Sequence, residues 1–147
     1  SSLHLQVNDF RSMVFINNGG QSYTAKPLPN EAQVSPINGI VVVDVNNDGN
    51  QDLVVAGNMY HAEVETPRYD AGNGLVLLGD GKGNFNPLNV LESGFFAPKD
   101  VKDVALIRLG AKKEMGILVT NNNGGLQLFR LKGNDRVALK EKMNLLC

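Results

Sequence analysis

The sequence predicts an all-β fold built from short antiparallel strands. Its apolar residues occur in runs of four or five that are rich in β-branched side chains, and such runs are too short for helices. Sixteen glycines and many asparagines separate these runs, as expected of tight turns. The 147 residues, 42% of them hydrophobic, suffice for one globular domain with a buried core.

The composition argues against several functional classes. A net charge of −1 gives no sign of the basic face of a nucleic-acid-binding protein, so we expect no nucleic-acid partner. No run approaches the roughly eighteen apolar residues of a membrane span, and no signal-peptide pattern is present. Because Cys147 is the only cysteine, an intramolecular disulfide is excluded.

The first strands are predicted from the apolar pattern in chain order. Leu3, Leu5 and Val7 alternate with polar residues, which is typical of a half-buried strand. A hairpin with a glycine-rich turn follows, and then a second hairpin around an acidic loop. The strands of these hairpins are expected at Met13–Ile16 and Tyr23–Leu28, and at Ile40–Val43 and Leu53–Ala56.

The acidic loop of the second hairpin has the composition of a calcium site. Its oxygen-bearing side chains alternate along the chain and can converge on one cation, because Ca²⁺ prefers six to eight oxygen ligands. Gly49 lets the chain turn back, so that the last two positions can close the shell. Without a cation the clustered aspartates would repel one another. The candidate ligands are Asp44, Asn46, Asp48 and Asp52 by side chain, and Asn50 by its carbonyl.

Two other interpretations of this loop compete with the calcium site. An EF-hand requires helices on both sides and a glutamate at the twelfth position, where this chain has Val55. The EF-hand is therefore excluded. A hairpin turn without metal stays open as an alternative, since Asn, Asp and Gly are the ordinary residues of turns.

Both hairpins recur after about 60 residues, a period that indicates a repeat architecture. The first returns as runs at Leu75–Leu78 and Phe85–Leu88, and the second as runs at Val104–Ile107 and Met115–Val119. In the second copy Arg108 occupies the place of Asp44, so we expect no calcium there.

A third copy of the first hairpin ends the chain. Its runs are Leu126–Leu131 and Val137–Leu139, although a short helix from Arg136 would also fit the last run. Four strands in each repeat are typical of a blade of a β-propeller.

Two stretches carry a resemblance to a known family. The sequence VVVDVNNDGNQDLVV, followed by LVLLGDGKGNF, resembles the FG-GAP (VCBS-type) repeats of integrin α-subunit propellers and of many secreted bacterial proteins. The resemblance implies Ca²⁺ bound by Asp44, Asn46, Asp48, Asn50 and Asp52. It also implies a partial blade at 1–30, a complete blade with the calcium loop at 38–92, a blade with a degenerate loop at 100–142 and a tail at 143–147.

About two and a half blades do not close a ring, since propellers ordinarily have four to eight. An unclosed blade presents an apolar face and an open sheet edge, both of which favour association. We therefore expect the chain to be part of a larger propeller, associated with the remaining blades or with copies of itself.

The long connection at residues 61–74 is a candidate recognition loop, because unusually long loops are often functional. Its polar residues would suit a glycan or a protein ligand. As an alternative, Arg68 pairs with a neighbouring carboxylate and only orders the crossover. The candidate residues are Glu63, Glu65, Arg68, Tyr69 and Asp70.

We expect a non-enzymatic binding or scaffold module, because the sequence has neither a nucleophile elbow nor a reactive-cysteine setting, and no catalytic residue stands out. A calcium site suits millimolar extracellular calcium and indicates an extracellular, cell-surface or periplasmic location. Two alternatives stay open. In the first, the chain is the C-terminal part of a propeller in a secreted enzyme whose catalytic residues lie outside this segment. In the second, it is a glycan-binding lectin.

Overall fold

The computed structural model describes residues 3–131 and the backbone of residues 140–145. The predicted fold class is confirmed: the chain is all-β, with ten strands in three antiparallel sheets over the described residues. The only helices there are a 3₁₀ turn, η1 (Asn30–Ala32), and a short helix, α1 (Val90–Ser93). The strands are β1 (Met13–Asn17), β2 (Tyr23–Pro27), β3 (Gly39–Val43), β4 (Asp52–Ala56), β5 (Leu75–Gly79), β6 (Phe85–Leu88), β7 (Val101–Leu109), β8 (Glu114–Asn121), β9 (Gly124–Arg130) and β10 (Lys140–Leu145).

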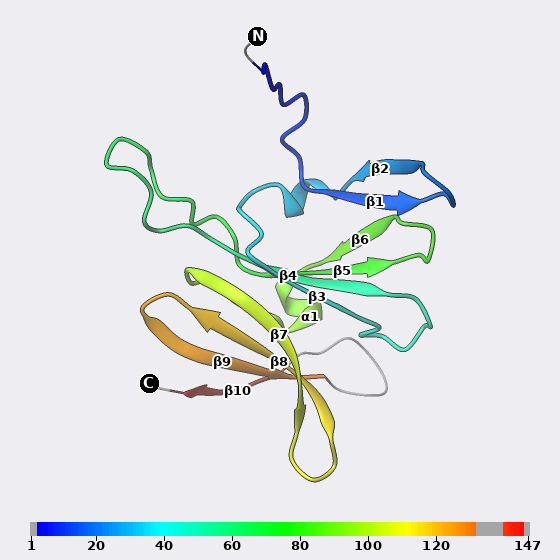
Figure 1. Ribbon diagram of the computed structural model, residues 1–147. Helices are drawn as coiled ribbons and strands as arrows, with labels where there is room; N and C mark the ends of the chain where they lie inside the picture. Colours follow the sequence, from blue (N-terminus) through cyan, green and yellow to red (C-terminus); the bar gives the residue numbers. More distant parts are fainter. Residues whose placement is uncertain (1–2, 132–139, 146–147) are drawn as a thin grey trace.

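Two of the sheets have four strands each, in the order in which the strands follow along the chain. One has the order β3-β4-β5-β6 and the other β7-β8-β9-β10, and all of their neighbouring strands are antiparallel. This up-and-down order is the one expected of a propeller blade. The hairpin of β1 and β2 forms the third sheet (Figure 1).

The inner strands of the middle sheet, β4 and β5, are covered on both faces, which explains their nearly continuous apolar runs. On one face Val54 and Val76 belong to the larger core cluster, which the β7–β10 sheet completes. On the other face Val55 and Leu77 pack with residues of the N-terminal hairpin and of the connection after it. All four side chains are buried, and burying each contributes about 1.5–3 kcal/mol.

The first strands of the two four-stranded sheets, β3 and β7, pack against each other. Gly39 opens β3 at a point where the β7 backbone comes very close. A Cβ atom on Gly39 would overlap with the backbone nitrogen of Val104 and lie 2.7 Å from its Cγ2 atom. A glycine is therefore needed for the two sheets to pack at this distance.

The N-terminal hairpin lies beside the β5–β6 hairpin of the middle sheet (Figure 1). The Lys26 ammonium donates to the carbonyl of Lys82 at 2.9 Å and to Oδ1 of Asn84 at 3.0 Å. The hairpin does not cover β3, where Ile40 and Val42 each remain 54% exposed. An apolar part of the middle sheet therefore faces solvent.

One predicted strand is wrong. Residues 3–7 form no strand, and Leu3, Leu5 and Val7 are all exposed on a segment that extends away from the body (Figure 1). Alternation alone does not make a strand, because its backbone groups need a partner. β1 pairs only with β2 among the described strands, so no second strand supports this segment.

At the other end of the chain, the predicted run at 137–139 and the alternative helix from residue 136 lie outside the described residues. The strand that pairs with β9 there is β10.

Candidate functional sites

The predicted calcium loop joins β3 to β4. Val43 and Asp52 are paired at the ends of the two strands, so the loop is held at the closed end of an antiparallel hairpin. Asn47 and Gly49 both have positive φ, at 59° and 88°, and turn the chain back on itself. The strand–loop–strand context expected of this segment is therefore present.

The side chains of the loop bend inward over its own backbone. Oδ1 and Oδ2 of Asp44 accept from the backbone N–H groups of Asp48, at 3.2 Å, and Gly49, at 2.9 Å. Oδ1 of Asp48 accepts from the Asn50 N–H at 2.7 Å, and its Oδ2 accepts from the Asn46 amide at 2.9 Å. These two bonds lower the pKa of Asp48.

Asp52 differs from the other loop aspartates because it is fully buried. Its two carboxylate oxygens accept from the backbone N–H groups of Val45, at 2.9 Å, and Gly79, at 2.8 Å. Burial nevertheless raises the pKa of Asp52, and the charges of Asp48 and Asp44 raise it further. The loop therefore concentrates negative charge around a buried carboxylate.

Within the described residues, no group of three or more His, Cys, Asp or Glu side chains is arranged to hold a metal ion. The three aspartates of the loop instead direct their oxygens at N–H groups. The donor types are those that Ca²⁺ takes, namely carboxylates, an amide and a carbonyl.

The corresponding connection between β7 and β8 is a tight turn. Arg108, at the place of Asp44, lies within β7 and is paired with Met115 of β8. Leu109 and Glu114 form the last pair, and the Glu114 carboxylate lies 3.0 Å from the Arg130 guanidinium. The turn thus consists of residues 110–113, and its neighbouring carboxylate is held by an arginine.

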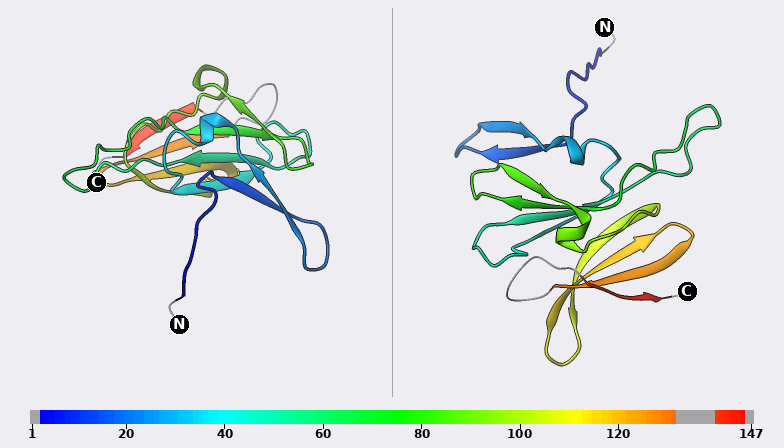
Figure 2. Two further views of the ribbon diagram at one scale, coloured as in Figure 1. Left: turned by 90° about the horizontal axis from the view of Figure 1, so that it is seen from above. Right: turned by 180° about the vertical axis from the view of Figure 1, so that it is seen from behind.

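The long connection between β4 and β5 projects from the body (Figure 2). Met59 and Tyr69 are joined by a β-bridge near its base, and Glu63 lies in the exposed tip with Glu65. Arg68 donates from Nε to Oδ2 of Asp70 at 2.6 Å. The pairing of Arg68 with a neighbouring carboxylate, weighed as an alternative to ligand recognition, is thus observed.

Of the five residues predicted for this loop, the structure brings Arg68 and Asp70 together. Arg68 also lies over the ring of Tyr60, with 4.9 Å between the guanidinium carbon and the ring centroid. Tyr69 is about half exposed beside this group, while the two glutamates stay at the tip.

A buried asparagine at the base of the loop was not predicted. Asn58 donates from Nδ2 to the carbonyl of Gly72 at 2.8 Å and lies within 3.1 Å of the carbonyls of Pro98 and Lys99. Its Oδ1 accepts from the Ser35 hydroxyl at 2.6 Å and from the Gly72 N–H. We call these five residues the Asn58 cluster; it joins three connections that are far apart in the sequence.

Asp100, also buried, lies next to the cluster in the sequence. It accepts from the Lys102 ammonium at 2.7 Å and from the Asn122 amide at 3.1 Å. Although burial favours the neutral acid, these two bonds hold the pKa of Asp100 below its ordinary value. Asp100 directly precedes β7 and Asn58 lies two residues after β4, and neither position marks a buried polar side chain in the sequence.

Comparison of the chain with protein-family models, curated proteins and solved structures yielded no match. In the part of the chain that the structure describes, no helix has the length and apolar character needed to cross a membrane.

Proposed function

We propose that the chain is a Ca²⁺-stabilised segment of a β-propeller of FG-GAP (VCBS) type, and that it acts outside the cell as a non-enzymatic binding or scaffold module. Two features of the fold support the propeller. Each complete sheet is a four-stranded meander, and the two complete sheets pack on each other with their first strands, β3 and β7, in contact. Adjoining propeller blades have the same arrangement.

The observation that carries the proposal is the uncovered face of β3. Successive residues of a strand point to opposite faces, so Ile40 and Val42 lie on the face opposite Val41. Val41 is buried in the core that the β7–β10 sheet completes, whereas Ile40 and Val42 are each 54% exposed. If two further strands joined the β1–β2 sheet, that sheet would have four strands. The added strands would then cover Ile40 and Val42.

The N-terminal segment supplies a candidate for one of these two strands. In both complete sheets, the strand that precedes the third strand in the chain is hydrogen-bonded to it, as β4 is to β5 and β8 is to β9. The segment Leu3–Val7 has the corresponding position in the chain, directly before β1, and its apolar residues are exposed. We infer that it pairs with β1 when another blade or another copy of the chain supplies the first strand.

The calcium part of the proposal rests on the chemistry of the loop. Asp44, Asn46, Asp48 and Asp52 would contribute side-chain oxygens, and Asn50 its carbonyl. Burial, and after it the charges of Asp48 and Asp44, raise the pKa of Asp52, and a divalent cation would offset both effects. Bound Ca²⁺ supplies no chemistry here beyond fixing the β3–β4 hairpin.

Sedimentation measurements on the 147-residue chain over a range of concentrations test association through the β3 face. We expect a species larger than a monomer, and the combined Ile40→Asp and Val42→Asp substitutions should return it to a monomer. Val64→Asp is the matched control, because Val64 is fully exposed on the long loop, away from this face. A wild-type chain that is monomeric at every concentration would contradict self-association.

A second candidate function is recognition of a glycan or a protein by the long loop. It is favoured by the fixed base of the loop and by the exposed Tyr69 beside the Arg68–Asp70 pair. Binding on a glycan array that disappears with Arg68→Ala and persists with the surface control Lys82→Ala would support it. An array without signal would count against a lectin.

A further inference from the structure

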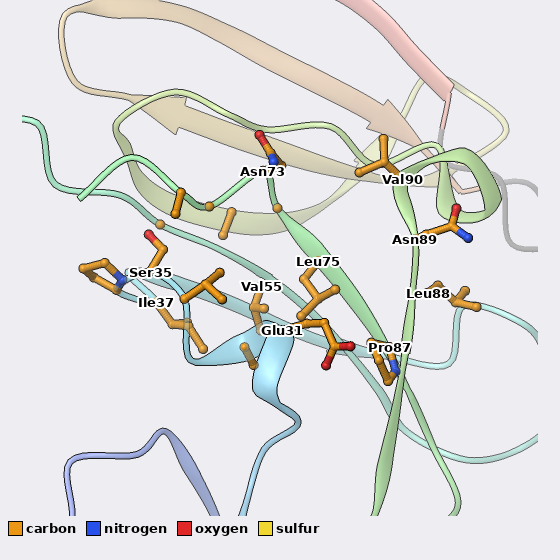
Figure 3. Close-up of a pocket in the computed structure, with 18 of the residues that line it drawn as sticks. Glu31, Ser35, Ile37, Val55, Asn73, Leu75, Pro87, Leu88, Asn89 and Val90 are labelled. Carbon is orange, nitrogen blue, oxygen red and sulfur yellow. The ribbon is translucent and has the colours of Figure 1, made fainter. Parts of the chain in front are cut away.

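A pocket lies at the end of the middle sheet opposite the predicted calcium loop (Figure 3). Its volume is about 440 Å³, within the range of sites for small molecules. Its wall is formed by the ends of β4 and β6, the start of β5, the connection from η1 to β3, and the first residues of α1. It shares no residue with the loop at 44–52 or with the tip of the long loop.

The interior of the pocket is apolar. Ile37, Val55, Leu75 and Leu88 line it, and Val55 is almost completely buried. Close packing fixes one wall, because a Cβ atom on Gly57 would overlap with the carbonyl oxygen of Pro36. The pocket is therefore largely preformed, and an apolar group that enters it would leave water without rearranging the sheet.

The charged residues that line the pocket are both acidic. They are Glu31 of η1 and Glu92 of α1, and the lining includes no lysine, arginine or histidine. Glu31 forms no side-chain hydrogen bond or ion pair with any residue that the structure describes. Glu92 is held in place because one of its oxygens accepts from the Asn89 N–H at 3.2 Å, as part of the capping box of α1.

We propose that this pocket binds a small amphipathic cation, with its apolar body against Val55 and Leu75 and its ammonium group at the acidic rim near Glu31. The apolar wall provides the driving force, and the two carboxylates select for positive charge. A carboxylate ligand of the same shape would bring a third negative charge to this rim. A neutral ligand would gain only the apolar contact.

Three ligands with the same apolar body and different charges test this selectivity. Binding of 4-phenylbutylamine, 4-phenylbutanol and 4-phenylbutyrate to the full chain can be followed by ¹H–¹⁵N NMR titration. We expect the amine to bind most tightly and the acid most weakly. The shifted amide signals should belong to residues 31–37, 55–57 and 71–75.

Two variants separate the charge from the shape of the pocket. Glu31→Gln should weaken amine binding by about threefold to fivefold, the range for one partly exposed ion pair, and leave the alcohol unaffected. Adding Glu92→Gln should weaken it further, and a glutamine can still complete the capping box. Glu63→Gln, which removes the same charge from the tip of the long loop, is the matched control.

Equal affinity for the amine, the alcohol and the acid would overturn the proposal, as would no shift with the amine at about ten millimolar. Signals that move only in the loop at 44–52 would also overturn it. The result does not depend on calcium, so it stands or fails separately from the proposed function.

Discussion

Replacing Asn58 by alanine should destabilise the chain strongly, although Asn58 is a single polar residue at the edge of a loop. Its amide reaches three backbone carbonyls and its oxygen accepts two hydrogen bonds, from Ser35 and Gly72. An NH₂ group has only two hydrogens, so at most four full hydrogen bonds can be made at one time.

The expected cost follows from these bonds. At about 1 kcal/mol net for each bond, losing four of them gives an upper figure of about 4 kcal/mol. Water that reaches the freed groups of Gly72 would recover part of this, so we expect about 2–4 kcal/mol. Urea unfolding should show a lower midpoint and an unchanged m-value.

Asn58→Asp distinguishes hydrogen bonding from side-chain volume. It keeps the size of the side chain but places a carboxylate oxygen against the carbonyls of Gly72, Pro98 and Lys99. Burial and these carbonyls should raise the pKa of the new carboxyl group above its unfolded value. The stability of the variant relative to wild type is therefore best at low pH and falls as the pH rises through that raised pKa.

The control for both variants is Asn86→Ala, because the Asn86 side chain is exposed on β6. If Asn58→Ala costs no more than Asn86→Ala, or if Asn58→Asp shows no pH dependence beyond that of wild type, the structural role assigned to Asn58 is refuted.

Other predictions concern packing and one exposed carboxylate. Gly39→Ala should lower stability by about 1–3 kcal/mol in urea unfolding, because the new methyl group would force Val104 and β7 away from β3. Leu77→Ala should cost about 2–5 kcal/mol in the same assay, since Leu77 is completely buried; a smaller loss would mean a loosely packed face. Hydrogen bonds from Asn84 and Lys82 lower the pKa of Asp80 to about 2. The contribution of Asp80 to stability is therefore present above the pKa that this group has in the unfolded chain, and it is lost as the pH falls towards about 2. A ¹³C NMR titration should show that midpoint, and Asn84→Ala should raise it.

The inner strands of the middle sheet, β4 and β5, were predictable because both of their faces are buried. Ile40–Val43 and Leu53–Ala56 were expected as strands, and β3 and β4 each begin one residue earlier than those runs. A strand buried on both sides needs apolar residues at every position, and runs of four or five residues are too short for a helix.

The segment at 3–7 was mispredicted for a reason that sequence patterns do not contain. Its alternation marks which residues would be buried in a sheet, but a strand also needs a neighbour for its backbone. Among the strands that the structure describes, none lies beside the free edge of β1, so the segment forms no strand and stays exposed.

The sequence carries a signal for the helix α1. Asn89, followed three residues later by Glu92, is the pattern of a capping box, and Gly94 closes the helix with a left-handed backbone. Its four residues are too few for a helical period to be recognised from the apolar pattern.

The residues of the candidate calcium loop could be named from their spacing, because they lie within one short segment. The residues of the Asn58 cluster and those that line the pocket could not be named from the sequence. Each set comes from connections that are distant in the sequence. Asn58 follows Gly57, and such a pair normally indicates only a turn. Glu31 and Glu92 line the same pocket only after the sheet has formed.

A thermal unfolding measurement with and without calcium tests the central claim most directly. If the loop binds Ca²⁺ with the affinity of an extracellular module, a hundredfold excess over Kd stabilises the chain by about 2.7 kcal/mol. For a chain of this size the melting temperature should rise by about 5–10 °C. Asp48→Ala should abolish the rise, and Asp80→Ala, in the neighbouring turn, should preserve it. A melting temperature that is the same at this calcium excess and in EDTA would contradict the account.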